Sequence, residues 1–271
     1  MPGDDDLEPV LRDLVFGRLG QTRAKVANSP ETRAFLEIGL DLLRDDLVQH
    51  TGPDFETGLR SKLFESISRE RILQRAAAAD EGRRDKRLLT VNMFRYRWER
   101  KDRYTEDLIS YMFRLTPQRS HLDDMHAASD RLIREVSYAE LVRTVADAEV
   151  RAVLADPLVV VQTIVQNAMP NHPRVREFCR VHLDHVLPRW AQLYEKVTAA
   201  YGFRLRPAYT WLDIAVMFNA VTEGELVWAR TTGRPELSTG DHVLAGVVLA
   251  LTPALFENVP ADLETCYAVA K

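Results

Sequence analysis

Apolar residues recur every three or four positions through most of the chain, which is the spacing of one face of a helix. Turns that contain proline or glycine separate these stretches, as at 170–173 and 232–235. No stretch alternates between apolar and polar residues as a half-buried strand does, so we expect an all-α fold. The predicted helices cover about 31–49, 55–79 with a bend near 66–68, 88–98, 101–115, 121–155, 157–169, 173–201, 208–232 and 239–257.

The first thirty residues predict an accessory segment. Residues 1–6 are polar and acidic, and we expect a disordered tail there. An amphipathic spacing follows over 7–19, which predicts a short helix covering the body of the protein. We therefore divide the chain into a tail with a short helix (1–30), a first helical domain (31–116) and a larger second helical domain (117–271).

Composition and charge narrow the class of protein. The chain has 271 residues, of which 46% are hydrophobic, and a formal net charge of −4. Between Arg60 and Arg103, however, fourteen Lys and Arg residues stand against seven Asp and Glu, so this segment carries +7 and the rest −11. Lys and Arg supply most of the affinity for DNA by neutralising phosphates. A basic segment on an acidic body is therefore compatible with DNA binding.

The segment 88–102 has the most informative chemistry. Val91, Phe94 and Trp98 share one face of a short predicted helix, which we expect to be buried. The opposite face carries asparagine, arginine and tyrosine, and such side chains suit base edges and phosphates when a helix enters the major groove. A basic aromatic helix can also be an ordinary solvated surface, and the chemistry alone leaves both interpretations open.

The residues 89–104 resemble the recognition helix and following helix of TetR-family regulators. They align without a gap to the family pattern Val-Ser-x-Gly-x-Leu/Phe-Tyr-x-His-Phe-x-x-Lys-Glu-x-Leu, with the family's glycine replaced by Asn92. The stretch 32–43, an arginine and apolar residues around Gly39, is similar to the family's first helix. The connection from that helix to the motif is about twenty residues longer than usual, and Ser68–Ala79 is our choice for the second helix.

The resemblance implies a helix-turn-helix DNA-binding domain. It places Thr90 and Lys101 on phosphates, and Arg95 and Arg97 where the family's tyrosine and histidine clamp the backbone. A homodimer would set two such helices in successive major grooves of a palindromic operator. Ligand entry into the C-terminal helices would change their separation and weaken binding, as in a repressor. The predicted DNA-binding residues are Thr90, Asn92, Met93, Arg95, Tyr96, Arg97 and Lys101.

The second domain is expected to hold a small-molecule effector of unknown class and to form the dimer. The stretch 211–226 resembles the family's penultimate helix, and with 240–256 it would make a four-helix interface. Small residues, Ala245, Gly246, Ala250 and Ala254, suit close helix approach, although a buried core explains them nearly as well. The predicted ligand-binding residues, all aromatic, thioether or imidazole side chains, are Met169, Phe178, His182, Trp190, Tyr194, Trp211, Met217 and Phe218.

Other functions have weaker support. We find no phosphate-binding loop, nucleophile elbow, zinc-type cysteine spacing or diiron pattern, so we predict no enzyme activity, cofactor or metal. The acidic N-terminus and the absence of a long apolar stretch predict a cytoplasmic protein without a membrane anchor. One rival is a helical adaptor whose basic segment contacts an acidic protein surface. Another is a diverged regulator that no longer recognises a DNA sequence.

Overall fold

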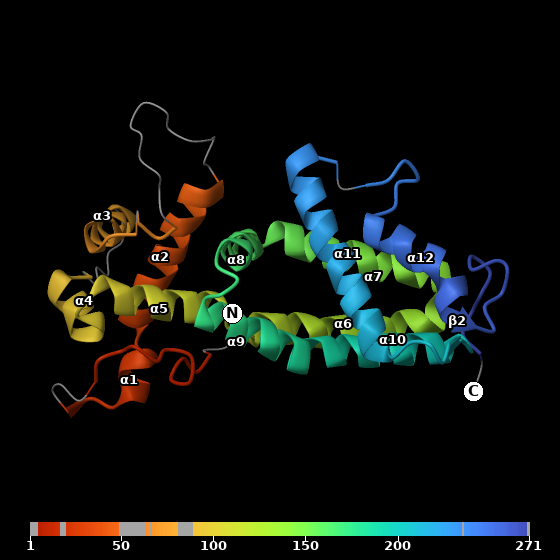
Figure 1. The fold of residues 1–271 in the computed structure, drawn as a ribbon, viewed down its shortest axis with the longest axis horizontal. Coiled ribbons are helices and arrows are strands. Elements are labelled where there is room, and N and C mark those ends of the chain that lie inside the picture. Colours follow the sequence, from red (N-terminus) through yellow and green to blue (C-terminus); the bar gives the residue numbers. More distant parts are fainter. Residues whose placement is uncertain are drawn as a thin grey trace. The chain divides into compact units, whose positions relative to one another are not determined.

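The computed structural model describes residues 5–16, 20–48, 63–65, 67–80, 89–234 and 236–269. This part of the chain is predominantly helical (Figure 1), which confirms the all-α expectation at the level of the fold class. A pair of two-residue antiparallel strands, Arg204–Leu205 (β1) and Phe256–Glu257 (β2), was not predicted. None of the described helices is long and apolar enough to cross a membrane.

The chain forms two compact units. The first comprises residues 1–114 together with 157–178, and the second comprises 115–156 together with 179–271. The chain first passes from one unit to the other at 114/115, close to the domain boundary that the sequence predicted at 116/117. The return of 157–178 to the first unit differs from the sequence expectation, which assigned that stretch to the second domain. The chain finally leaves the first unit after residue 178, inside helix α9 (Pro173–Val181).

Helices of the first unit pack around a cluster of aromatic rings. Phe35 on α2 (Pro30–Val48), Phe94 and Trp98 on α4 (Val91–Trp98), and Tyr104 on α5 (Lys101–Met112) are almost completely buried. Neighbouring ring centroids lie 5.0–5.9 Å apart. Tyr104 approaches Gly39 so closely that α2 has room for no side chain there. The helices of this unit are α1 (Arg23–Ala27), α2 (Pro30–Val48), α3 (Arg69–Asp80), α4 (Val91–Trp98), α5 (Lys101–Met112) and α8 (Pro157–Ala168), followed by the start of α9.

In the second unit α11 crosses α7 and α10, and α12 lies beside α7 (Figure 1). A turn of π-helix, η2 (His182–Val186), leads into α10 (Leu187–Ala200). Because Pro188 has no N–H and its ring crowds the carbonyl four residues earlier, a wider turn fits this position better than a regular one. The remaining helices of this unit are α6 (Thr116–Glu135), α7 (Tyr138–Ala155), α11 (Trp211–Thr232) and α12 (Val243–Leu255).

The predicted helix at 7–19 is wrong over the residues that the structure describes there, 5–16, which form turns and irregular chain. The amphipathic spacing did identify side chains that become buried, since Leu7, Leu11 and Leu14 are all covered. Leu11 N still donates to the Leu7 carbonyl at 2.9 Å, but several other backbone N–H groups of this segment find partners elsewhere. Leu7 N donates to the Asn28 side chain at 2.7 Å, and Val15 N donates to the Arg97 carbonyl at 2.7 Å. Tertiary hydrogen bonds thus replace most of those that a helix would have made.

Candidate DNA-binding surface and ligand cavity

Helix α4, the predicted recognition helix, is fixed at its start and along its inner face. Thr90 is its N-cap, and the Thr90 hydroxyl accepts a hydrogen bond from Met93 N at 3.2 Å. Such a cap stabilises a helix by about 1 kcal/mol. Phe94 and Trp98 fill the aromatic cluster below, as the spacing predicted. The prediction was wrong for Val91, which is exposed in the first turn of the helix. An eight-residue helix, too short to be stable alone, is held by this packing.

The outer face of α4 is open to solvent. Asn92, Arg95 and Tyr96 are exposed, and 53% of the Tyr96 surface is accessible. Met93 is half-buried beside them. These four residues lie within about one turn of the helix, and they present an amide, a guanidinium and a phenol together. The face can therefore donate and accept hydrogen bonds over an area suited to a polar partner.

Arg97 points in a different direction from the one the motif implied. Its guanidinium donates from Nε to Thr32 Oγ1 at 2.9 Å, and from its terminal nitrogens to Ser29 Oγ and to the Met93 carbonyl, each at 3.1 Å. Glu31 lies 3.3 Å away, and only 13% of the Arg97 side chain is exposed. Burial lowers the pKa of this guanidinium. Arg97 therefore ties α4 to the start of α2, and we leave it out of the proposed DNA-binding surface.

The two flanking residues of the predicted surface have structural partners as well. The Thr90 hydroxyl oxygen accepts the cap bond described above, although the residue itself is exposed. Lys101, also exposed, donates from Nζ to the Glu65 carbonyl at 2.8 Å. An ammonium has three N–H donors, so this bond leaves Lys101 able to meet a phosphate.

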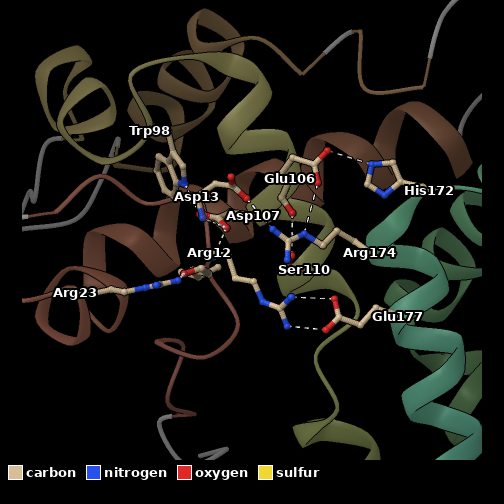
Figure 2. Close-up of polar contacts among 11 residues, drawn as sticks. Arg12, Asp13, Arg23, Trp98, Glu106, Asp107, Ser110, His172, Arg174 and Glu177 are labelled. Carbon is tan, nitrogen blue, oxygen red and sulfur yellow. Dashed lines mark hydrogen bonds and ion pairs between the residues drawn. The ribbon is translucent and has the colours of Figure 1, made fainter.

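A buried carboxylate connects the N-terminal segment to α4 and α5. Asp107 on α5 is 0% exposed, and one of its oxygens accepts from Arg12 N at 2.8 Å and from Asp13 N at 3.0 Å. Its other oxygen accepts from Trp98 Nε1 at 2.9 Å (Figure 2). Burial raises the pKa of Asp107 to about 6, and these hydrogen bonds oppose the shift. The indole of the predicted recognition helix is thereby held in a single orientation.

Ion pairs connect the N-terminal segment, residues 5–16, to the start of α9 (Figure 2). Arg12 makes a two-pronged contact with Glu177, with nitrogen–oxygen distances of 2.7 and 3.0 Å. Arg174 lies 3.0 Å from Asp13 and 3.6 Å from Glu106. All of these groups belong to the first unit. Residues 5–16 therefore brace the unit that carries α4.

The second unit contains a largely apolar cavity of about 90 Å³. Its walls come from α6, α7, α10, α11, α12 and β2, and most of the lining side chains are aliphatic or aromatic. Trp190 stacks on Tyr194 with ring centroids 5.9 Å apart, and Tyr194 meets Phe218 edge-on at 5.3 Å. An apolar space with a few polar groups is the usual form of a small-molecule site.

Three of the eight predicted ligand-binding residues line this cavity, namely Trp190, Tyr194 and Phe218. Two others, Met169 and Phe178, belong to the first unit, where Phe178 packs on Phe113 with ring centroids 4.6 Å apart. The sequence assigned both residues to the second domain, whereas the chain returns to the first unit over 157–178, and neither residue lines the cavity.

The last three predicted residues lie near the cavity without lining it. His182 on η2 is hydrogen-bonded to Asn219, a lining residue, and burial lowers the pKa of its imidazole. Trp211 stacks on Phe256 with centroids 5.8 Å apart, and Met217 packs against the core of the second unit. These side chains support the walls rather than face the space.

Several lining residues had no signal in the sequence. Ser129 on α6 and Glu149 on α7 sit on helices whose apolar stripes pointed only to a core. Glu149 shares a hydrogen bond with His121, and this bond raises the pKa of the imidazole. The cavity therefore has one carboxylate, which is paired with a histidine, in a mostly apolar lining.

Comparisons with family models, with curated proteins and with solved structures found no match to this chain.

Proposed function

We propose that this protein is a ligand-responsive transcriptional regulator of the TetR type, most simply a repressor, that binds a palindromic operator as a homodimer. One observation carries the proposal. Helix α4 has its aromatic side buried in a rigid cluster and exposes Asn92, Arg95 and Tyr96 together on the other side. Arginine and asparagine are well shaped to read guanine and adenine in the major groove.

The surroundings of α4 support this role. Helices α3 and α5 flank it, and α3, Arg69–Asp80, coincides with the stretch chosen from the sequence as the second helix of the motif. The indole bond to Asp107 and the Arg97 bonds to α2 hold α4 in place from two sides. A rigid mount limits the entropy lost when a surface helix binds DNA.

Exposed apolar side chains on α11 support the proposed homodimer. Val227 and Trp228, near the end of this helix, are 53–55% exposed, and Val216, about three turns earlier, is 43% exposed. Large apolar side chains clustered on a surface mark association sites more often than isolated ones do. Of the small residues noted in the sequence, Ala250 and Ala254 are exposed, whereas Ala245 is buried and Gly246 packs against Leu237 of the same chain. The proposed interface therefore rests mainly on α11, with α12 contributing its C-terminal half.

Selection of bound DNA from a random duplex pool tests the proposal. We expect a palindromic site whose affinity falls steeply with salt concentration, because each neutralised phosphate releases counterions. Recovery of no sequence, with weak retention of any DNA, would favour the adaptor or the diverged regulator over a sequence-specific repressor. An acidic protein partner would then separate the adaptor from the diverged regulator.

Arg95→Ala tests the position of the DNA-binding surface. We expect about a 10-fold loss of affinity for the selected site, since a direct arginine contact contributes about 1–3 kcal/mol. Arg131→Ala is the matched control, an exposed arginine on α6 in the other unit. Fluorescence anisotropy at several salt concentrations measures both variants. Equal affinities for Arg95→Ala and Arg131→Ala would place the surface elsewhere.

Trp228→Glu tests the dimer. A charge in the middle of an apolar interface has no partner, so we expect the variant to sediment as a monomer and to bind the palindrome more weakly. Tyr267→Glu is the control, because Tyr267 is 63% exposed and lies outside α11. Analytical ultracentrifugation compares the two. A monomeric wild-type protein, or a Trp228→Glu variant that still dimerises, would contradict this interface.

A further inference from the structure

One fully buried polar group in the cavity lining has no hydrogen-bond partner among the described residues. Ser129 on α6 is 0% exposed and lines the cavity, and its hydroxyl makes no hydrogen bond to any described residue. A buried hydroxyl without a partner costs about 1–3 kcal/mol. A serine also weakens the interior of a helix relative to alanine. The hydroxyl is therefore unfavourable for folding in two respects, which is understandable if a ligand completes its hydrogen bonding.

Most of the other hydroxyl and amide groups of the lining are already engaged, whereas the Tyr194 hydroxyl, like that of Ser129, makes no hydrogen bond to a described residue. Tyr138 pairs with Thr252 at 3.3 Å, and Thr222 donates to the Phe218 carbonyl at 3.0 Å. The Asn219 amide nitrogen lies 2.9 Å from the Glu223 carboxylate. The Tyr194 side chain is only partly buried, whereas Ser129 is fully buried, so the Ser129 hydroxyl gains most from a bound molecule.

The lack of unpaired charged groups in the part of the lining that the structure describes favours an uncharged ligand. Among the described lining residues there is no Lys, Arg or His, so an anion would enter an apolar space without a counter-charge. The one carboxylate, Glu149, already has His121 as its partner. A cation would have to compete with that pair. The described lining therefore offers no free counter-charge to either an anionic or a cationic ligand.

Size and wall chemistry limit the ligand further. An engineered protein cavity of about 150 Å³ holds one benzene molecule, and the cavity here is about 90 Å³. The cavity is smaller than one that holds benzene, so a single ring is the largest rigid group that could enter, and the walls must move outward to admit it. The Trp190, Tyr194 and Phe218 rings offer it faces and edges for stacking.

We propose that the cavity binds an uncharged single-ring aromatic molecule with one hydroxyl or amino group, and that this group hydrogen-bonds to Ser129. The binding itself does not depend on the proposed function. Only the statement that this molecule is the effector of a regulator rests on it. Ser129 is the residue that distinguishes a substituted ring from a plain hydrocarbon of the same size. The aromatic walls supply affinity, and the serine supplies specificity.

Calorimetric titration of the full chain with phenol, toluene and benzoate tests the proposal. We expect phenol to bind about 10-fold more tightly than toluene, because only phenol satisfies the serine. Benzoate should bind more weakly than either. In Ser129→Ala, phenol and toluene should bind with affinities within about 3-fold of each other, and the toluene affinity should stay at the wild-type value. Ala146→Leu, which fills the cavity from α7, should weaken both ligands.

Three results would overturn the proposal: equal affinities of phenol and toluene for the wild-type protein, tightest binding of benzoate, or a preference for phenol that survives in Ser129→Ala. Because Ser129→Ala removes a group without adding bulk, loss of folding is not expected to obscure the result. The DNA selection separates the two claims. A selected operator without phenol binding would reject this ligand class alone, whereas serine-dependent phenol binding without an operator would reject the regulator and leave the site standing.

Discussion

Two aromatic clusters, one in each unit, have similar composition but differ in how their polar groups are satisfied. In the first unit Phe35, Phe94, Trp98 and Tyr104 are fully or almost fully buried, and their polar atoms are paired. Tyr104 donates to the Phe35 carbonyl at 2.7 Å, and Trp98 donates to Asp107 at 2.9 Å. In the second unit the rings of Trp190, Tyr194 and Phe218 border a cavity, next to a serine without a partner among the described residues.

The comparison of the two clusters shows why one set of aromatic rings forms a closed core and the other borders a cavity. Ring spacing is alike in the two, with centroids 5.0–5.9 Å apart in the first and 5.3–5.9 Å in the second. In the first cluster the neighbouring backbone helps to close the space. Gly39 lets Tyr104 fill the space against α2, so the first cluster closes completely. A closed cluster suits a rigid mount for α4, and an open one suits a sensor.

Gly39→Ala should have the largest effect, because it breaks the closed cluster. A methyl group there would clash with Tyr104 Oη, whose ring packs against the Phe94 and Trp98 rings. Overpacking of a rigid core costs about 1–3 kcal/mol, and a contact this short should reach the upper end of that range. Gly224→Ala on α11 is the matched control, since a methyl group there meets nothing within 4 Å.

Gly224→Ala should instead stabilise its helix by up to about 1 kcal/mol. Chemical denaturation followed by tryptophan fluorescence and circular dichroism compares the two variants. Equal effects of the two substitutions, of either sign, would contradict the tight packing of Tyr104 against α2.

Asp107→Asn should have the next largest effect, since it alters the polar pairing of the closed cluster. One amide oxygen cannot replace two carboxylate oxygens, and the amide NH₂ would face either the indole N–H of Trp98 or the backbone N–H groups of Arg12 and Asp13. We expect a loss of about 2 kcal/mol at pH 7, in the range for an unsatisfied buried group. The N-terminal segment should also become more susceptible to proteolysis, because Asp107 anchors it. Unchanged stability and unchanged proteolysis would show that this carboxylate does not hold the segment.

The pH dependence of that variant adds a second measurement. The pKa of Asp107 is raised from 3.8 to about 6 by burial, so between these values the folded protein holds more protons than the unfolded chain. The contribution of Asp107 to the free energy of unfolding should therefore fall as the pH rises from about 4 to about 6. The amide in Asp107→Asn cannot titrate, so the stability difference between the two proteins should narrow over this window. A constant difference would argue against the shifted pKa.

The sequence predicted most helices correctly because their cores are formed by regular apolar stripes. Phe94 and Trp98 became buried, and α2 begins and ends within a residue of its predicted bounds. The same pattern failed for residues 7–16 because it reports which side chains are covered and not where the N–H groups find partners. Asn28 and Asp107, 21 and 95 residues distant from the groups they bind, supplied those partners.

The candidate DNA-binding surface and ligand cavity were harder to predict for a related reason. Arg97 lies between the buried positions 94 and 98, so its direction depended on the polar end of α2, where Ser29 and Thr32 capture it. The cavity is a space that the side chains of the surrounding helices leave unfilled. The presence of aromatic residues in a sequence does not predict such a space. Ser129 had no sequence signal, since a serine on an amphipathic helix is commonplace.

Ser129→Ala in the ligand-free protein should have the smallest effect and the opposite sign. Removing a buried hydroxyl without a partner should raise the free energy of unfolding by about 1 kcal/mol, part of it from the better helix propensity of alanine. Ser110→Ala on α5 is the matched control, because the Ser110 hydroxyl donates to the Glu106 carbonyl at 3.0 Å. The propensity gain is shared by both variants, so the excess stabilisation of Ser129→Ala isolates the cost of the unpaired group. No excess in thermal unfolding would mean that the hydroxyl is satisfied without a ligand, and the contrast between the closed and the open cluster would then rest on shape alone.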